Sequence, residues 1–134
     1  VYGPIDSPFV MFGPWETRPE APWTTEPPRV SEEDCAKFMC RYLLLAISSG
    51  HVARVYWWRL THRGFGLVDD ADPANPRLRP AFFALKNLLA QLAGARFERR
   101  VEDVPAGTFA LEFSRADGSR FTLRWTRDSF PGLA

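Results

Sequence analysis

The sequence has few residues of the types that build metal or redox centres. It contains two cysteines and two histidines in 134 residues, and neither a Cys-x-x-Cys pair nor a histidine at ligand spacing accompanies Cys35 or Cys40. We therefore expect no metal site and no cofactor. The two cysteines lie five residues apart on a predicted helix, whose rise and turn hold them too far apart for a disulfide. We interpret both as small buried apolar residues, which leaves the compartment open between the cytoplasm and the periplasmic or secreted space.

The sequence also lacks an excess of one charge and a long apolar run. Seventeen basic and sixteen acidic residues are interspersed, for a formal net charge of +1, so we expect neither nucleic acid nor a membrane surface as a partner. The longest strongly apolar stretch is the middle of a predicted helix and is shorter than the ~20 residues of a membrane span. The N-terminus has no basic region followed by an apolar core, so no signal peptide is predicted.

Apolar residues make up 46% of the chain and aromatic residues 14%, enough to bury the core of one domain. Most of the twelve prolines lie within residues 1–30, where they exclude regular helix, and only residues 8–12 resemble a short strand. Beyond this segment the hydrophobic pattern becomes periodic. Regular secondary structure is therefore expected from about residue 31 onwards.

Two helices have clear start and stop signals. Ser31 is a predicted N-cap, three acidic residues follow it, and Gly50 ends the helix. Pro80 stands at the first position of a second helix over residues 81–93, whose leucines form one apolar stripe, and Gly94 closes it.

Between the helices, residues 51–60 are rich in strand-favouring side chains that are apolar on both faces, which predicts a parallel strand. Residues 61–79 are then expected to form a long loop. After Gly94 the period changes to two, and residues 109–113 and 121–125 predict an antiparallel hairpin around an Asp-Gly turn. A further strand is predicted at residues 97–101.

The order strand, helix, strand, helix implies parallel pairing through a right-handed crossover. A closed eight-stranded barrel takes about 250 residues, so this chain has room for only part of one. We therefore predict an α/β fold in which residues 1–94 are the last two β/α units of a TIM-type barrel, with a proline-rich loop at residues 13–30. Residues 95–134 are predicted to form a small antiparallel β extension.

The tandem Trp57-Trp58 is the first candidate site. It ends the predicted strand and precedes a glycine-bearing loop. A tryptophan face offers a flat apolar surface to the C–H side of a pyranose ring, while Arg59, His62 and Arg63 could address sugar hydroxyls. The alternative for the tryptophans is burial in the core, and the alternative for His62 is a loop-capping role, which we prefer.

Several segments in order resemble the C-terminal part of bacterial glycoside hydrolases with a (β/α)8 barrel, most like family 39. They are Trp15-Glu16-Thr17, Val30-Ser31-Glu32-Glu33, Ser49-Gly50, Val55-Tyr56-Trp57-Trp58-Arg59-Leu60, Gly64-Phe65-Gly66-Leu67-Val68-Asp69 and Arg79-Pro80-Ala81-Phe82 with Ala84-Leu85. The similarity covers about residues 8–94. The hairpin that follows resembles the small β-domain behind the barrel of such enzymes.

The resemblance implies a retaining mechanism with two carboxylates ~5 Å apart. In these enzymes the acid/base lies in an Asn-Glu pair on the fourth strand, which this chain does not contain. The nucleophile lies in a Thr-Glu-x-Gly-Trp pattern after the seventh strand, where this chain reads Val10-Met11-Phe12-Gly13-Pro14-Trp15. Met11 thus occupies the glutamate position, and a thioether cannot attack an anomeric carbon. We expect this chain alone to be inactive.

The remaining carboxylates near the expected site can each be explained without a catalytic role. Glu16 is a weak catalytic candidate, because it aligns with an ordinary loop glutamate of the family and a solvated position suits it better. Asp69 and Asp70 follow the predicted eighth strand, on the catalytic face of a barrel, yet acids before Pro73 typically form turns. Arginines in residues 96–100 and 120–127 are expected on a solvated sheet face.

Three functions fit this sequence. The first is a C-terminal portion of a glycoside hydrolase acting on polysaccharide or oligosaccharide, with Trp57, Trp58, Trp15 and His62 binding the sugar. The second is a non-catalytic carbohydrate-binding module that uses the same aromatic side chains. The third is a structural or interaction domain. The expected partners are a carbohydrate and either the missing N-terminal barrel portion or an oligomeric partner that covers unpaired strands.

Overall fold

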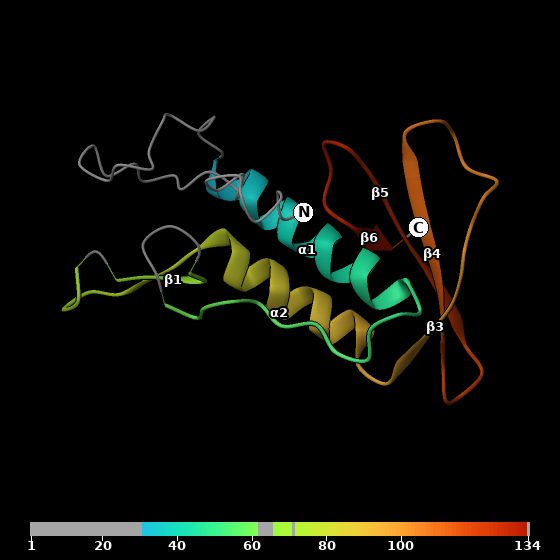
Figure 1. The fold of residues 1–134 in the computed structure, drawn as a ribbon, viewed down its shortest axis with the longest axis horizontal. Helices are drawn as coiled ribbons and strands as arrows, with labels where there is room; N and C mark the ends of the chain where they lie inside the picture. Colours follow the sequence, from blue (N-terminus) through green and yellow to red (C-terminus); the bar gives the residue numbers. More distant parts are fainter. Residues whose placement is uncertain (1–30, 62–65, 71, 134) are drawn as a thin grey trace.

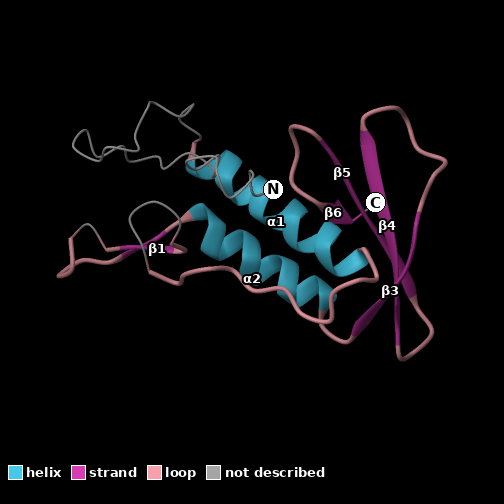
Figure 2. Cartoon of the chain, in the orientation of Figure 1, coloured by secondary structure: helices cyan, strands magenta, loops and turns pink. Residues whose placement is uncertain are grey.

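The computed structural model describes residues 31–61, 66–70 and 72–133. In chain order the elements are α1 (Glu32–Ser48), β1 (Val68–Asp69), β2 (Arg77–Leu78), α2 (Pro80–Leu92), β3 (Ala95–Arg100), β4 (Thr108–Arg115), β5 (Arg120–Thr126) and β6 (Gly132–Leu133). The strands form a two-stranded sheet, β1-β2, and a four-stranded sheet, β3-β4-β5-β6. Figures 1 and 2 show the helices side by side, the small hairpin at one end and the larger sheet at the other. The fold is α/β, and the described residues close no barrel.

Both helices begin and end as the sequence predicts. The Ser31 hydroxyl accepts a hydrogen bond from the Asp34 backbone N–H at 3.0 Å, which satisfies one of the amides left open at the start of α1. Gly50 and Gly94 adopt φ of 75° and 66° after the two helices, a conformation that favours glycine. Pro80 is the first residue of α2.

Both cysteines are free and buried on α1, as the sequence predicts. Burial raises the pKa of the Cys35 thiol to about 12 and that of Cys40 to about 11. The two thiols therefore stay protonated near neutral pH and pack as apolar groups.

The predicted hairpin after α2 is confirmed. Leu111 of β4 pairs with Leu123 of β5, and Phe113 pairs with Phe121 in the same antiparallel ladder. The additional predicted strand is β3, which pairs antiparallel with β4. Because side chains alternate across a strand, these apolar residues share the sheet face that meets the helices, while the opposite face carries arginines, glutamates and hydroxyls.

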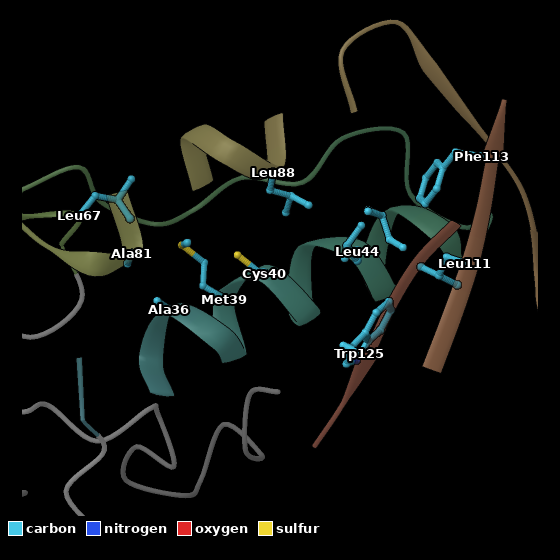
Figure 3. Close-up of a cluster of buried hydrophobic side chains, with 11 residues drawn as sticks. Ala36, Met39, Cys40, Leu44, Leu67, Ala81, Leu88, Leu111, Phe113 and Trp125 are labelled. Carbon is cyan, nitrogen blue, oxygen red and sulfur yellow. The ribbon is translucent and has the colours of Figure 1, made fainter. Parts of the chain in front are cut away.

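One hydrophobic core connects the helices with the larger sheet. Its buried members are Ala36, Met39, Cys40, Leu44, Leu67, Ala81, Leu88, Leu111, Phe113, Leu123 and Trp125. Figure 3 shows the residues of α1 leading along the helix to the point where Leu111, Phe113 and Trp125 approach from the sheet. The helical part and the β extension therefore share a single core. No helix in the described ranges is long and apolar enough to cross a membrane.

The prediction of a strand over residues 51–60 is wrong for the described chain. The segment is extended but belongs to no sheet, and its end makes one isolated parallel bridge, between Thr61 and Val68. A strand needs a hydrogen-bonded neighbour, and strand-favouring side chains alone cannot supply one. The predicted parallel pairing is wrong as well, because every pair of named strands is antiparallel. The expected loop over residues 61–79 also contains the short β1-β2 hairpin.

Candidate functional site

The tandem tryptophans lie on opposite sides of the extended segment that connects α1 with α2. Val55 and Trp57 are half-buried, whereas Tyr56, Trp58 and Leu60 are exposed. Trp57 packs against the hydrophobic core, and Trp58 is 58% exposed. Over residues 55–58 the exposure alternates as it does in a strand, whereas Arg59 is exposed like Trp58 before it. One indole therefore packs on the hydrophobic core, and the other is exposed.

Two arginines accompany the exposed tryptophan. The Arg59 guanidinium lies over the Trp58 ring, 5.0 Å from its centroid, in a cation–π contact. Arg54 and Arg59 are both exposed, and neither forms an ion pair with any residue that the structure describes. The exposed side of this segment thus combines an aromatic face with positive charge.

A network of four charges lies beside this segment, at the end of the molecule where both helices begin. The Arg79 side chain is 2% exposed, and its Nη2 lies 3.1 Å from Oδ2 of Asp69. Arg77 bonds to the same Asp69 oxygen at 2.9 Å and to both carboxylate oxygens of Glu32, at 2.6 and 2.8 Å. Nε of Arg79 is 3.6 Å from Glu32 Oε1. The network ties the first turn of α1 to β1, β2 and the start of α2.

This network also fixes the end of the tryptophan segment. The Arg79 backbone N–H donates to the Leu67 carbonyl at 2.9 Å, and the Val68 N–H donates to the Leu60 carbonyl at 2.8 Å. Leu60 follows Trp58 by two residues, so the charged cluster and the aromatic face are linked through the backbone.

The Asp69 carboxylate contacts two arginines, Arg77 and Arg79, which gives it a structural role. Asp70 is half-buried, and its Oδ1 is shielded from solvent with no hydrogen-bond partner in the described part of the chain.

The charge network predicts a specific pH dependence of stability. The hydrogen bond from Arg77, opposed by partial burial, lowers the pKa of Glu32 from its ordinary value of 4.5. Because the folded-state pKa lies below the unfolded one, this contribution is complete above about pH 4.5 and is lost as the pH falls through the folded-state value. We expect Glu32→Gln to lose less free energy of unfolding between pH 6 and pH 3 than the parent protein, measured by urea denaturation.

Glu33→Gln provides the matched control, because Glu33 is the next residue along α1, is exposed, and among the described residues forms its ion pair with Lys37. It should retain the acid sensitivity of the parent protein. If Glu32→Gln and Glu33→Gln follow the same pH profile, the pairing of Glu32 with Arg77 does not contribute as described.

No family model matches this chain, and no curated protein and no solved structure matches it. The case for a function therefore rests on the residues of the site. Within the described ranges, no group of three histidine, cysteine, aspartate or glutamate residues could hold a metal ion.

The structure places only some of the predicted site residues. Trp57, Trp58, Asp69 and Asp70 are described, whereas Met11, Trp15, Glu16, His62 and Arg63 lie outside the described residues. Sequence reasoning missed the buried Arg79 and its network. A signal was present, because Arg79 directly precedes the helix-opening Pro80 and stands two residues after another arginine. Its burial depends, however, on carboxylates that are distant in the sequence.

Proposed function

We propose that this chain is the C-terminal portion of a (β/α)8-barrel glycoside hydrolase that acts on polysaccharide or oligosaccharide. In this proposal the chain supplies the aromatic sugar subsite and lacks the general acid and an intact nucleophile motif. The observation that carries the proposal is the opposite orientation of the two indoles: Trp57 packs on the core and Trp58 is exposed. An exposed tryptophan beside charged side chains is the kind of surface on which a pyranose ring stacks.

The path of the chain supports the barrel portion of this proposal. In Figure 1, α1 and α2 run in the same direction, and residues 51–61 between them return alongside the helices in an extended conformation. Successive β/α units of a barrel have the same connectivity, with a strand in place of the return segment. The exposed side chains of Tyr56, Trp58 and Leu60 would then face the barrel interior, and the missing N-terminal portion would supply the neighbouring strands.

The position of the aromatic face fits an active-site end. Trp58 lies close in sequence to Thr61, which bridges to Val68 at the start of the β1-β2 hairpin. This hairpin leads directly into the N-terminus of α2 at Pro80. In (β/α)8 barrels the loops from strand to helix carry the active site at that same end.

A non-catalytic carbohydrate-binding module is the second candidate. It is favoured by the engagement of Glu32 and Asp69 with Arg77 and Arg79, because carboxylates held in ion pairs are poor proton donors. The same aromatic surface would then bind glycan with no chemistry. The exposed apolar side chains of Leu45, Ile47, Phe83 and Leu89 favour the third candidate, a structural or interaction domain with an oligomeric partner.

Binding experiments on the two tryptophans test the sugar subsite. We expect Trp58→Ala to weaken oligosaccharide binding by roughly tenfold, because it removes the exposed aromatic face, with little effect on stability. Trp57→Ala should lower the free energy of unfolding by about 2 kcal/mol, because Trp57 contacts the core. Titration calorimetry with neutral and acidic oligosaccharides measures the first effect, and thermal unfolding measures the second.

Phe83→Ala is the control for Trp58→Ala, because it also removes an exposed aromatic ring, from α2. It should leave binding unchanged. A well-folded parent protein that binds no oligosaccharide at millimolar concentration would refute the subsite. A gene that encodes an apolar strand ending in Asn-Glu roughly 100 residues upstream would favour the hydrolase over the binding module.

A further inference from the structure

The segment around the aromatic face is locally basic in a nearly neutral chain. Residues 51–68 contain three arginines and two histidines and no aspartate or glutamate, although the whole chain has seventeen basic and sixteen acidic residues. Two of these arginines, Arg54 and Arg59, are described, exposed and not engaged in ion pairs with described residues. The arginines of the neighbouring network, Arg77 and Arg79, are instead neutralised by Glu32 and Asp69. Among the described residues, therefore, no acidic side chain pairs with the positive charge at the aromatic face.

One of these two arginines, Arg59, also contacts the Trp58 ring. The Arg59 guanidinium lies over the Trp58 ring, 5.0 Å from its centroid, so a sugar that packs on that ring face must displace this exposed side chain and then lies next to it. Arg54 lies four residues before Trp58 and is also exposed, and four residues of extended chain span roughly 13 Å. That separation is about the length of two or three pyranose rings. The segment thus exposes two guanidinium groups at a separation that a short saccharide can span.

We propose that the saccharide bound at this surface is acidic, with uronic acid units whose carboxylates pair with Arg59 and Arg54. This inference rests on the proposed sugar subsite and adds the class of sugar. A guanidinium group matches a carboxylate with two parallel N–H donors, while the C–H face of the same sugar packs on Trp58. A neutral sugar would leave both arginines without an anionic partner.

Single-stranded nucleic acid also combines negative charge with rings that stack on aromatic side chains. Its affinity for proteins comes largely from many phosphate contacts along a basic groove. The described part of this segment offers two exposed arginines, and the chain as a whole has a formal charge of +1. The smaller number of charges fits a short acidic saccharide better.

Calorimetric titration of the full chain tests the inference. The probes are trisaccharides of glucuronate, galacturonate and mannuronate, each compared with its carboxyl-reduced neutral counterpart. We expect at least one acidic trisaccharide to bind roughly fivefold tighter than its neutral counterpart, with a preference that falls as salt is raised. Arg59→Gln should remove most of the preference without lowering the unfolding temperature. Arg96→Gln, which removes an exposed arginine of β3, should preserve it.

The possible failures are distinguishable. Equal binding of acidic and neutral trisaccharides, or an unchanged preference in Arg59→Gln, overturns the acidic class and leaves the sugar subsite standing. No binding of any trisaccharide overturns both the inference and the proposed function. Tighter binding of an oligo-deoxythymidine than of every trisaccharide overturns the inference in favour of nucleic acid.

Discussion

Replacing Arg79 with methionine is expected to lower the free energy of unfolding by about 3 kcal/mol, the lower end of the cost of breaking a buried ion pair. Methionine keeps much of the apolar volume of the side chain but removes the charge. Asp69 then loses a partner 3.1 Å away, and Glu32 loses a nearby positive charge, while both carboxylates remain largely shielded from solvent. Arg77 still contacts both of them, which keeps the expected loss from being larger.

The matched variant is Arg77→Met, which removes an arginine from the same network. The Arg77 side chain is 55% exposed, so solvent screens its interactions, and we expect a loss below about 1 kcal/mol. Urea denaturation of both variants gives the comparison. If Arg79→Met costs no more than Arg77→Met, burial does not strengthen the pairs of Arg79.

The helices and the hairpin could be predicted from the sequence because their signals are local. Ser31 accepts the Asp34 amide within one helical turn, and Gly94 takes the left-handed conformation that ends α2. The β4-β5 hairpin has a strict two-residue apolar period and a turn with Gly118 at φ 84°. Each of these features requires only neighbours that are close in the sequence.

Whether residues 51–60 form a strand could not be predicted from such local signals. The sequence predicts apolar side chains buried on both faces, but only Val55 and Trp57 of this segment are half-buried, and its backbone bonds to a described strand through the Leu60 carbonyl, which accepts from the Val68 N–H at 2.8 Å. A strand requires a neighbouring strand, and the parallel neighbours that a barrel would provide have no counterpart in the described residues. The composition therefore predicted an extended segment correctly, but it predicted wrongly that this segment pairs with a neighbouring strand in a sheet.

For the candidate site too, the sequence indicates local features and misses contacts between distant residues. The sequence predicted that one indole faces substrate and the other packs outward against a helix; Trp57 packs on the core and Trp58 is exposed, and sugar binding by Trp58 stays a prediction. It did not predict the burial of Arg79, which depends on Glu32, 47 residues earlier, and on Asp69. Contacts between residues so distant in the sequence follow from the packing of α1 against α2, which no local pattern describes.

Leu44→Ala is expected to lower the free energy of unfolding by about 3 kcal/mol, within the range for a large-to-small substitution in a core. Leu44 is fully buried on α1, in the cluster that contains Leu88 of α2 and Leu111 and Trp125 of the sheet. Figure 3 shows it where α1 meets the sheet residues. The cost has two parts, the lost burial of the leucine side chain and the cavity that remains. Because helices and sheet share this cluster, the variant should unfold in a single transition, which urea denaturation followed by both circular dichroism and tryptophan fluorescence would show.

Leu45→Ala makes the same chemical change at the next residue of α1, where the side chain is 42% exposed, so the loss should stay below about 1 kcal/mol. The difference between the two variants therefore measures the contribution of the shared core, since helix propensity changes equally in both. Similar losses in Leu44→Ala and Leu45→Ala would contradict the position of Leu44 in the core. Two separate transitions in Leu44→Ala would show instead that the helices and the β extension hold together less tightly than a shared core implies.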